Sequence, residues 1–197
     1  MFVKQNLFKM KNFFAIIIAV IIMRPAIAAP KKFSPFTGYY KNQISFNLAQ
    51  GIDNGFILPP PGKFVPFYIA GLQYSQPTTF FRIPARQSIN IAQTLGFGHK
   101  YGWDWGNFIT PIIFLSGDIM ILDLCKYYLT GGAGVGLQAE ENERLGAKLL
   151  FQFKIAAGWH IDNNWGLELY MQHFSNANTA PQNHSYAFYG LGITYNF

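Results

Sequence analysis

The fold is decided by the stretch Lys148-Leu149-Leu150-Phe151-Gln152-Phe153-Lys154-Ile155, in which apolar and polar side chains largely alternate. Successive side chains of a β-strand point to opposite faces. The stretch therefore has an apolar face of Leu149, Phe151, Phe153 and Ile155 and a polar face of Lys148, Gln152 and Lys154. This pattern is typical of a barrel whose outer surface meets lipid and whose interior is polar.

The same alternation recurs in eight segments separated by turn residues, such as Asp162-Asn163-Asn164 and Pro59-Pro60-Pro61-Gly62. The segments cover residues 44–50, 65–74, 87–98, 108–116, 126–138, 145–160, 165–175 and 186–197. Residues 119–122 fit either a turn or an extension of the fourth strand. The sequence predicts an all-β fold, an eight-stranded antiparallel transmembrane β-barrel of the bacterial outer membrane.

The polar faces predict a closely packed lumen. Glu168 falls on the inner side of its segment, as do Lys148 and Lys154, and we expect these charges to pair there because they are costly in lipid. Gly132, Gly134 and Gly136 also face inward, where small residues help a narrow barrel to close. Eight strands leave a lumen filled by side chains, which argues against a general porin.

The first 28 residues have the order of a secretory leader. Basic residues precede the apolar run at 13–23, and Ala26-Ile27-Ala28 follows it as a small-residue cleavage site. We predict a signal peptide at residues 1–28 and a single barrel domain at 29–197. The leader carries Lys4, Lys9, Lys11 and Arg24 and no acidic residue, so its removal lowers the formal net charge from +6 to +2.

Composition excludes several other classes of protein. Half of the 197 residues are hydrophobic, yet no apolar run reaches the roughly 20 residues of a transmembrane helix. The low charge of the mature chain, without a basic face interleaved with aromatic residues, argues against nucleic-acid binding. Cys125 is the only cysteine, which excludes an intrachain disulfide and a cysteine-rich metal site.

One motif suggests chemistry, His173-Phe174-Ser175-Asn176-Ala177 at the end of the seventh segment. His173 and Ser175 share a strand face with α-carbons roughly 6.5 Å apart, so the imidazole can act as a base for the hydroxyl. Their face is the apolar one, which carries Trp165, Leu167, Leu169 and Met171. If both termini are periplasmic, the pair lies at the outer leaflet and points toward lipid.

These residues, with the closing Tyr-rich strand, resemble the C-terminal signature of the PagL-type lipid A 3-O-deacylases. Members of that family are eight-stranded outer-membrane barrels that hydrolyse the ester-linked acyl chain at position 3 of lipid A. The resemblance implies that Ser175 is the nucleophile and His173 the general base. It also implies that Asn176 contributes to the oxyanion hole.

The chain departs from the family pattern at two places. Asn178 stands where the family has a glycine. The family also uses a loop glutamate to orient the histidine, but residues 176–185 contain no Asp or Glu, and His184 falls at the matching position. Asn183 is a second candidate for this orienting role, and Glu140, Glu141 and Glu143 in the neighbouring loop are others.

The resemblance implies lipid A, or lipopolysaccharide, as the substrate and the outer membrane as the location of this multi-pass chain. It implies neither a cofactor nor a metal. The sequence leaves open whether two copies of the chain form a homodimer. The alternative to a serine esterase is a non-catalytic barrel that binds lipid A or serves as an adhesin or structural protein.

Overall fold

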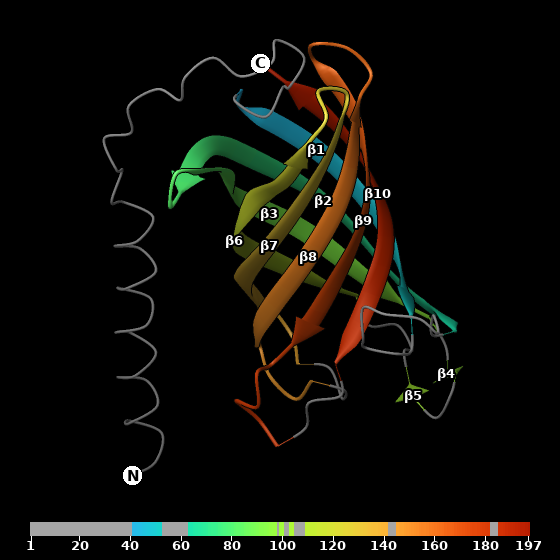
Figure 1. Ribbon diagram of the computed structural model, residues 1–197. Helices are drawn as coiled ribbons and strands as arrows, with labels where there is room; N and C mark the ends of the chain where they lie inside the picture. The colour runs from blue at the N-terminus through green and yellow to red at the C-terminus, as the bar shows by residue number, and fades with distance from the viewer. Residues whose placement is uncertain are drawn as a thin grey trace. The chain divides into compact units, whose positions relative to one another are not determined.

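A computed structural model (Figure 1) describes residues 41–52, 63–97, 99–100, 103–104, 109–141, 145–181 and 185–197, with backbone alone at 99–100 and 103–104. The strands are β1 (Gln43–Ile52), β2 (Phe64–Phe80), β3 (Ile83–Gly96), β4 (His99–Lys100), β5 (Trp103–Asp104), β6 (Ile109–Asp123), β7 (Tyr127–Gln138), β8 (Leu149–His160), β9 (Trp165–Ser175) and β10 (Tyr186–Asn196). Within these residues no helix is long and apolar enough to cross a bilayer. The predicted signal peptide lies outside the described residues and stays a prediction.

Eight of the strands close into an antiparallel barrel in the order β1-β10-β9-β8-β7-β6-β3-β2, which confirms the predicted fold class. Strand β9 has the predicted bounds. Strands β2 and β6 are longer than predicted, and residues 119–122 belong to β6 rather than to a turn. The short β4–β5 ribbon, which the sequence did not indicate, lies within the connection between β3 and β6.

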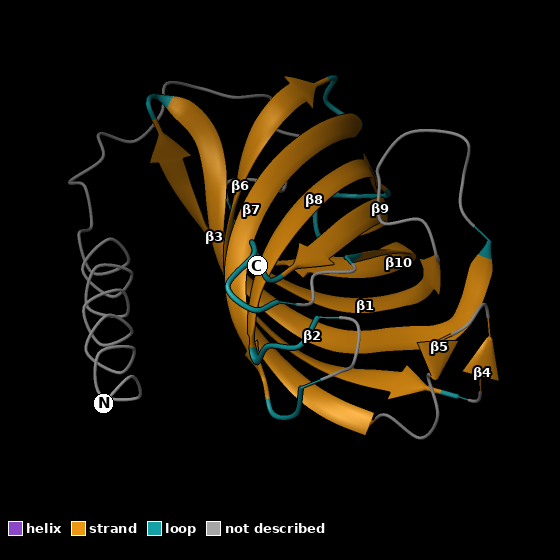
Figure 2. Ribbon diagram, turned by 90° about the horizontal axis from the view of Figure 1, so that it is seen from below, coloured by secondary structure: helices purple, strands orange, loops and turns teal. Residues whose placement is uncertain are grey.

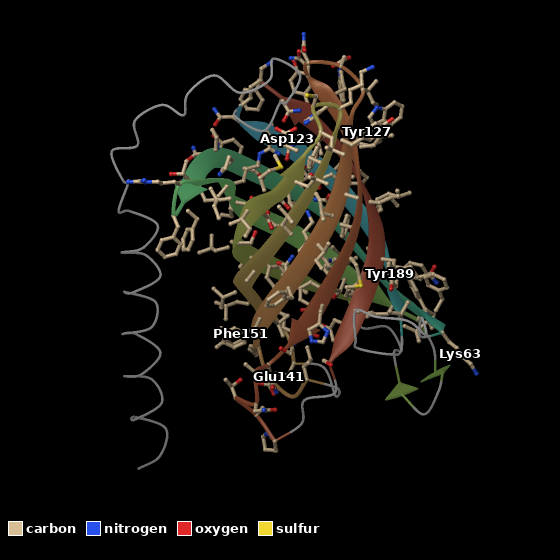
Figure 3. All side chains as sticks on the ribbon, in the orientation of Figure 1. Lys63, Asp123, Tyr127, Glu141, Phe151 and Tyr189 are labelled. Carbon is tan, nitrogen blue, oxygen red and sulfur yellow. The ribbon has the colours of Figure 1, made fainter. Side chains whose placement is uncertain are left out.

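The two ends of the barrel differ. One, here called the turn end, carries the short connections 81–82, 124–126 and 161–164. The other, the loop end, carries the longer connections and the last residue of β9. In Figure 3, Asp123 and Tyr127 mark the turn end, and Phe151 and Glu141 mark the loop end. Figure 2 shows the barrel from the loop end.

The barrel exposes apolar side chains and buries polar ones. Ile91, Leu169 and Leu191 are each 60–65% exposed on its outer wall, whereas Gln43, Ser75 and Asn196 are buried inside. A soluble monomer rarely exposes a continuous apolar surface that covers its whole outer wall. The distribution is that of a barrel whose outer wall faces lipid.

Charges pair in the lumen, as predicted for two of the three residues. The Lys154 ammonium lies 3.4 Å from a carboxylate oxygen of Glu168, and the Tyr128 hydroxyl donates to the other oxygen at 2.7 Å. The prediction was wrong for Lys148, which is exposed and precedes β8. Gly146, where φ is 55°, lies in the connection that precedes Leu149, the first residue of β8.

The glycine prediction is confirmed. Gly132, Gly134 and Gly136 alternate along β7 with the outward-facing Ala133 and Val135. A side chain at Gly136 would collide with the ring of Phe114, and one at Gly132 with Asp118. Small residues on one strand therefore leave room for large residues on the next.

The strand pairing defines the tilt of the barrel. From Tyr74, the partners on one side lead through Ile89, Leu115, Val135 and Phe151 to Ser175 on β9. On the other side they lead through Ile44 and Tyr195 to Trp165, ten residues earlier on β9. Ten residues of offset over eight strands corresponds to a tilt of about 41°, for a rise of about 3.3 Å per residue and a strand spacing of about 4.8 Å.

Candidate active site at the end of strand β9

His173 and Ser175 occupy the last two outward positions of β9. Both are half-buried, and the residue between them, Phe174, is buried inside the barrel. Phe153 of β8 and Ala187 of β10 pair with His173, and Phe151 of β8 pairs with Ser175. The structure therefore places both residues on the apolar outer wall at the loop end, as their spacing predicts.

Phe174 holds this end of β9 in place. Its ring centroid lies 4.9 Å from that of Phe114 on β6, 5.6 Å from Phe188 and 5.8 Å from Tyr186 on β10. Packed aromatic pairs at these separations contribute roughly 0.5–1.5 kcal/mol each beyond the area they bury. Because neighbouring side chains alternate across a strand, the inward anchoring of Phe174 fixes His173 and Ser175 outward.

Asn176 orders the chain as it leaves β9. Its side chain is fully buried, and its amide donates to the carbonyl oxygen of Leu145 at 2.6 Å. Its side-chain oxygen accepts the backbone N–H of Asn178 at 2.8 Å, and its backbone carbonyl accepts from Thr179. The side chain thus joins the β9–β10 connection to the segment that precedes β8.

The two residues that follow have left-handed backbone conformations, with φ of 50° at Ala177 and 60° at Asn178. Glycine adopts this region without steric penalty, and asparagine is enriched there among the other residues. Asn178 is therefore compatible with the backbone at the position where the family has glycine.

Of the candidates for the residue that orients His173, only Glu140 and Glu141 are among the described residues. His184 and Asn183 lie outside the described residues, as does Glu143. Glu140 and Glu141 are exposed beyond the end of β7, which is separated from β9 by β8. Among the described residues, no group of three or more His, Cys, Asp and Glu side chains is arranged to hold a metal ion.

An apolar groove runs along the outer wall beside the pair. Its lining includes Ile155, Met171 and Tyr189, which form one row across β8, β9 and β10. Met171 lies two residues from His173 on the same face. The groove has a volume of about 790 Å³, within the range of roughly 300–1,000 Å³ common for ligand sites. An apolar chain can therefore lie against the wall next to the pair.

The motif at residues 173–177 did not by itself reveal the two groups that hold the end of β9 in place, the Phe174 ring and the Leu145 carbonyl. Phe174 could have been identified, because its place between two outward residues makes it an inward aromatic. The partner of Asn176 could not, because Leu145 is 31 residues away in the sequence and nothing in its neighbourhood marks its carbonyl as an acceptor.

The fold is similar to those of three solved outer-membrane proteins. The crystal structure of the outer membrane enzyme PagL matches with a TM-score of 0.51 at 15% identity, covering 79% of this chain and 99% of that one. Neisserial surface protein A matches with 0.58 at 10% identity, covering 82% and 98%. The N-terminal β-barrel domain of Pseudomonas aeruginosa OprF matches with 0.51 at 11% identity, covering 80% and 98%.

Identities this low show a shared fold alone. No curated protein sequence matches the chain significantly. The family model described as lipid A 3-O-deacylase (PagL) matches residues 68–196, well over half of the chain and the whole of the segment that carries His173 and Ser175. The chain therefore belongs to the lipid A 3-O-deacylase (PagL) family.

Proposed function

We propose that this protein is an outer-membrane lipid A deacylase that hydrolyses a 3-O-linked acyl ester with Ser175 as the nucleophile and His173 as the general base. One observation carries the proposal: the family match includes a strand end where these two residues share the lipid-facing wall. Lipid A lies in the outer leaflet, so a site that opens sideways to lipid receives its substrate without extracting it from the membrane.

In the proposed reaction, His173 takes the proton of the Ser175 hydroxyl as its oxygen attacks the ester carbonyl carbon. The tetrahedral intermediate collapses to an acyl-enzyme, and the proton on His173 passes to the sugar oxygen that leaves. Water then attacks the acyl-enzyme with His173 again as the base, which releases the fatty acid and restores Ser175.

The negative charge on the intermediate needs hydrogen-bond donors. We propose that Asn176 contributes to this oxyanion site by fixing the turn that begins at its own backbone, because its side chain is already bound to Leu145 and Asn178. Removing one donor from an oxyanion site in other hydrolases costs about 10²–10³-fold in rate.

The third member of the site comes from the β9–β10 connection in this proposal, with His184 or Asn183 orienting the imidazole. Such a residue holds the reactive tautomer and stabilises the imidazolium that forms. The part of the apolar groove next to His173, which Ile155 and Met171 line, is proposed to hold the acyl chain that is removed, since these side chains are apolar.

Mass spectrometry of lipid A incubated with the refolded barrel tests this function. The wild-type protein is expected to remove one acyl chain, and Ser175→Ala and His173→Ala are expected to leave lipid A intact. Heat-modifiable migration on gels shows that each variant is folded. Intact lipid A with a folded wild-type barrel would instead support a non-catalytic lipid A binder, adhesin or structural protein.

A further inference from the structure

A polar side chain interrupts the apolar outer wall at Gln50. Its strand neighbours on the same face of β1, Phe46 and Leu48, are apolar and exposed. Gln50 pairs with Tyr68 of β2 on one side and with Tyr189 of β10 on the other, and all three lie at the apolar groove. Polar groups on a lipid-facing wall are uncommon without a partner or a function.

The local backbone directs this side chain. The pairing of β1 with β2 shifts directly after Gln50, where Gln50 is opposite Tyr68 but Ile52 is opposite Phe64. Pro66 lies in the irregular part of β2 and has no N–H for regular pairing. Irregularities of this kind reorient side chains and occur often beside functional sites.

The contact between Gln50 and Tyr68 leaves one acceptor, on Gln50, and one donor, on Tyr68, available to a ligand. Its amide nitrogen donates to the Val65 carbonyl and to the Tyr68 hydroxyl, each at 3.4 Å. Among the hydrogen bonds of the described residues, its carbonyl oxygen accepts none. The Tyr68 hydroxyl accepts from Gln50, so its own proton can be donated. A secondary amide, with one N–H and one C=O, is the complementary ligand.

Gln50 lies at the depth of the candidate active site. It is two strands from β9, in the row of Met171, while His173 is two residues further along β9. The α-carbons of Gln50 and His173 are therefore about 12 Å apart, and those of Gln50 and Ser175 about 16 Å. The strands are tilted by about 41°, so the step of two strands from β1 to β9 leads toward one end of the barrel and the step of two residues along β9 leads back. Gln50 and His173 therefore differ in depth along the barrel axis by only about 1 Å.

We propose that Gln50 and Tyr68 form a second substrate contact that binds the amide linkage of another acyl chain on the same glycolipid. The inference rests on the proposed function and adds a specificity determinant to it. A glycolipid with both an amide-linked chain and a reactive ester engages both sites at the same membrane depth. A simple single-chain ester engages the Ser175 site alone.

The test compares kcat/KM for purified lipid A with kcat/KM for a p-nitrophenyl fatty-acid ester. Gln50→Met keeps the length of the side chain and removes its hydrogen-bonding groups. Tyr68→Phe removes only the hydroxyl. The loss of these hydrogen bonds to the substrate is expected to lower the ratio of lipid A to simple-ester activity roughly tenfold in Gln50→Met, which corresponds to about 1.4 kcal/mol. A smaller fall is expected in Tyr68→Phe.

Phe46→Leu, on the same strand and face, is the matched control and is expected to keep the wild-type ratio. An unchanged ratio in Gln50→Met, or an equal loss on both substrates that indicates a structural role, would overturn the inference. A binding measurement separates it from the proposed function. Lipid A is expected to bind folded Ser175→Ala more tightly than Ser175→Ala/Gln50→Met, and equal binding would overturn the inference even if wild type is inactive.

Discussion

Asn178 shows how a single residue preserves the backbone next to the candidate site. Its φ of 60° lies in the left-handed region, which glycine and asparagine adopt and β-branched residues strongly disfavour. Its backbone N–H is bound by the side chain of Asn176, which ties this conformation to the end of β9.

We therefore expect Asn178→Gly to keep both the stability and the activity of the protein. Asn178→Val is expected to lower the free energy of unfolding by about 1–2 kcal/mol, because its branched side chain is strained in this region. Thermal unfolding in detergent micelles measures the difference. Equal melting temperatures for the two variants would show that the turn is not held in this conformation.

Residue positions on the wall could be predicted from the sequence, and hydrogen-bond partners could not. The alternation of β9 predicts that His173 and Ser175 face outward with Met171. It says nothing about the bond from Asn176 to Leu145 or the contact of Gln50 with Tyr68, because both depend on how separate strands are brought together. The roles assigned to His173, Ser175, Asn176, Asn183 and His184 stay predictions.

Asp162 organises the turn between β8 and β9. Its carboxylate accepts the backbone N–H groups of Trp165 and Asn164, each at 2.7 Å. These two bonds, the one from Trp165 first, hold the pKa of Asp162 below its ordinary value. A lowered pKa means that the charged carboxylate favours the folded state.

The stabilisation from Asp162 is therefore present at neutral pH and is lost as the pH falls through about 4 toward the lowered pKa. We expect Asp162→Ala to lower the melting temperature at pH 7 and to have a smaller effect at pH 3. Melting curves of both proteins at the two pH values measure this. An effect that grows with acidity would contradict the role of the carboxylate.

Gly158 on β8 leaves space for a large inward side chain on β7. A side chain at Gly158 would collide with the ring of Tyr128 on the neighbouring strand. That ring packs at a tilt against His160 with centroids 4.7 Å apart, and its hydroxyl donates to Glu168. The inward face of β8 therefore has no room for a larger residue at this position.

Gly158→Leu is expected to prevent folding of the barrel or to reduce its yield severalfold. Ala157→Leu places the same side chain on the outward face, where Ala157 is exposed, and is expected to fold normally. The folded fraction on unheated gels gives the comparison. Normal folding of Gly158→Leu would mean that Tyr128 does not fill this part of the lumen.

The far ends of β2 and β6 could not be predicted from the alternation of side chains. Polar residues Gln76, Thr78 and Thr79 end the apolar alternation of β2, yet its pairing with β3 continues to Phe80. Backbone hydrogen bonds to a neighbouring strand do not require an alternating side-chain pattern. The lengths of these strands are consequently set by their partners.

The barrel has an apolar exterior and a polar interior in which charged side chains are paired. Lys154 and Glu168 are both buried and form an ion pair, and Lys154 also lies 4.9 Å from the centre of the Tyr170 ring. Breaking one partner of such a pair leaves an uncompensated buried charge, which costs roughly 3–5 kcal/mol.

Glu168→Gln and Lys154→Met are each expected to destabilise the barrel by an amount near the lower end of that range. The double variant is expected to lose less than the sum of the two. Urea unfolding of the four proteins in a double-mutant cycle measures the coupling. Additive losses would show that the two charges do not stabilise each other.

The fold class, the number of barrel strands and the orientation of their faces could all be predicted from alternation, because the membrane requires an apolar wall along every strand of the barrel. The ten-residue offset could not, because it arises only when all eight pairings are known together. That offset brings Gln50 of the first strand to the depth of His173 near the end of the chain.

We propose that Ser175, activated by His173, carries out acyl transfer on the outer wall of the barrel. Labelling the refolded protein with a fluorophosphonate, which reacts covalently with activated serines, and mapping the adduct by peptide mass spectrometry tests it most directly. We predict an adduct on Ser175 in the wild type, much slower labelling in His173→Ala and none in Ser175→Ala. An adduct on another serine, or an unlabelled Ser175 in a barrel that deacylates lipid A, would show that Ser175 is not the nucleophile.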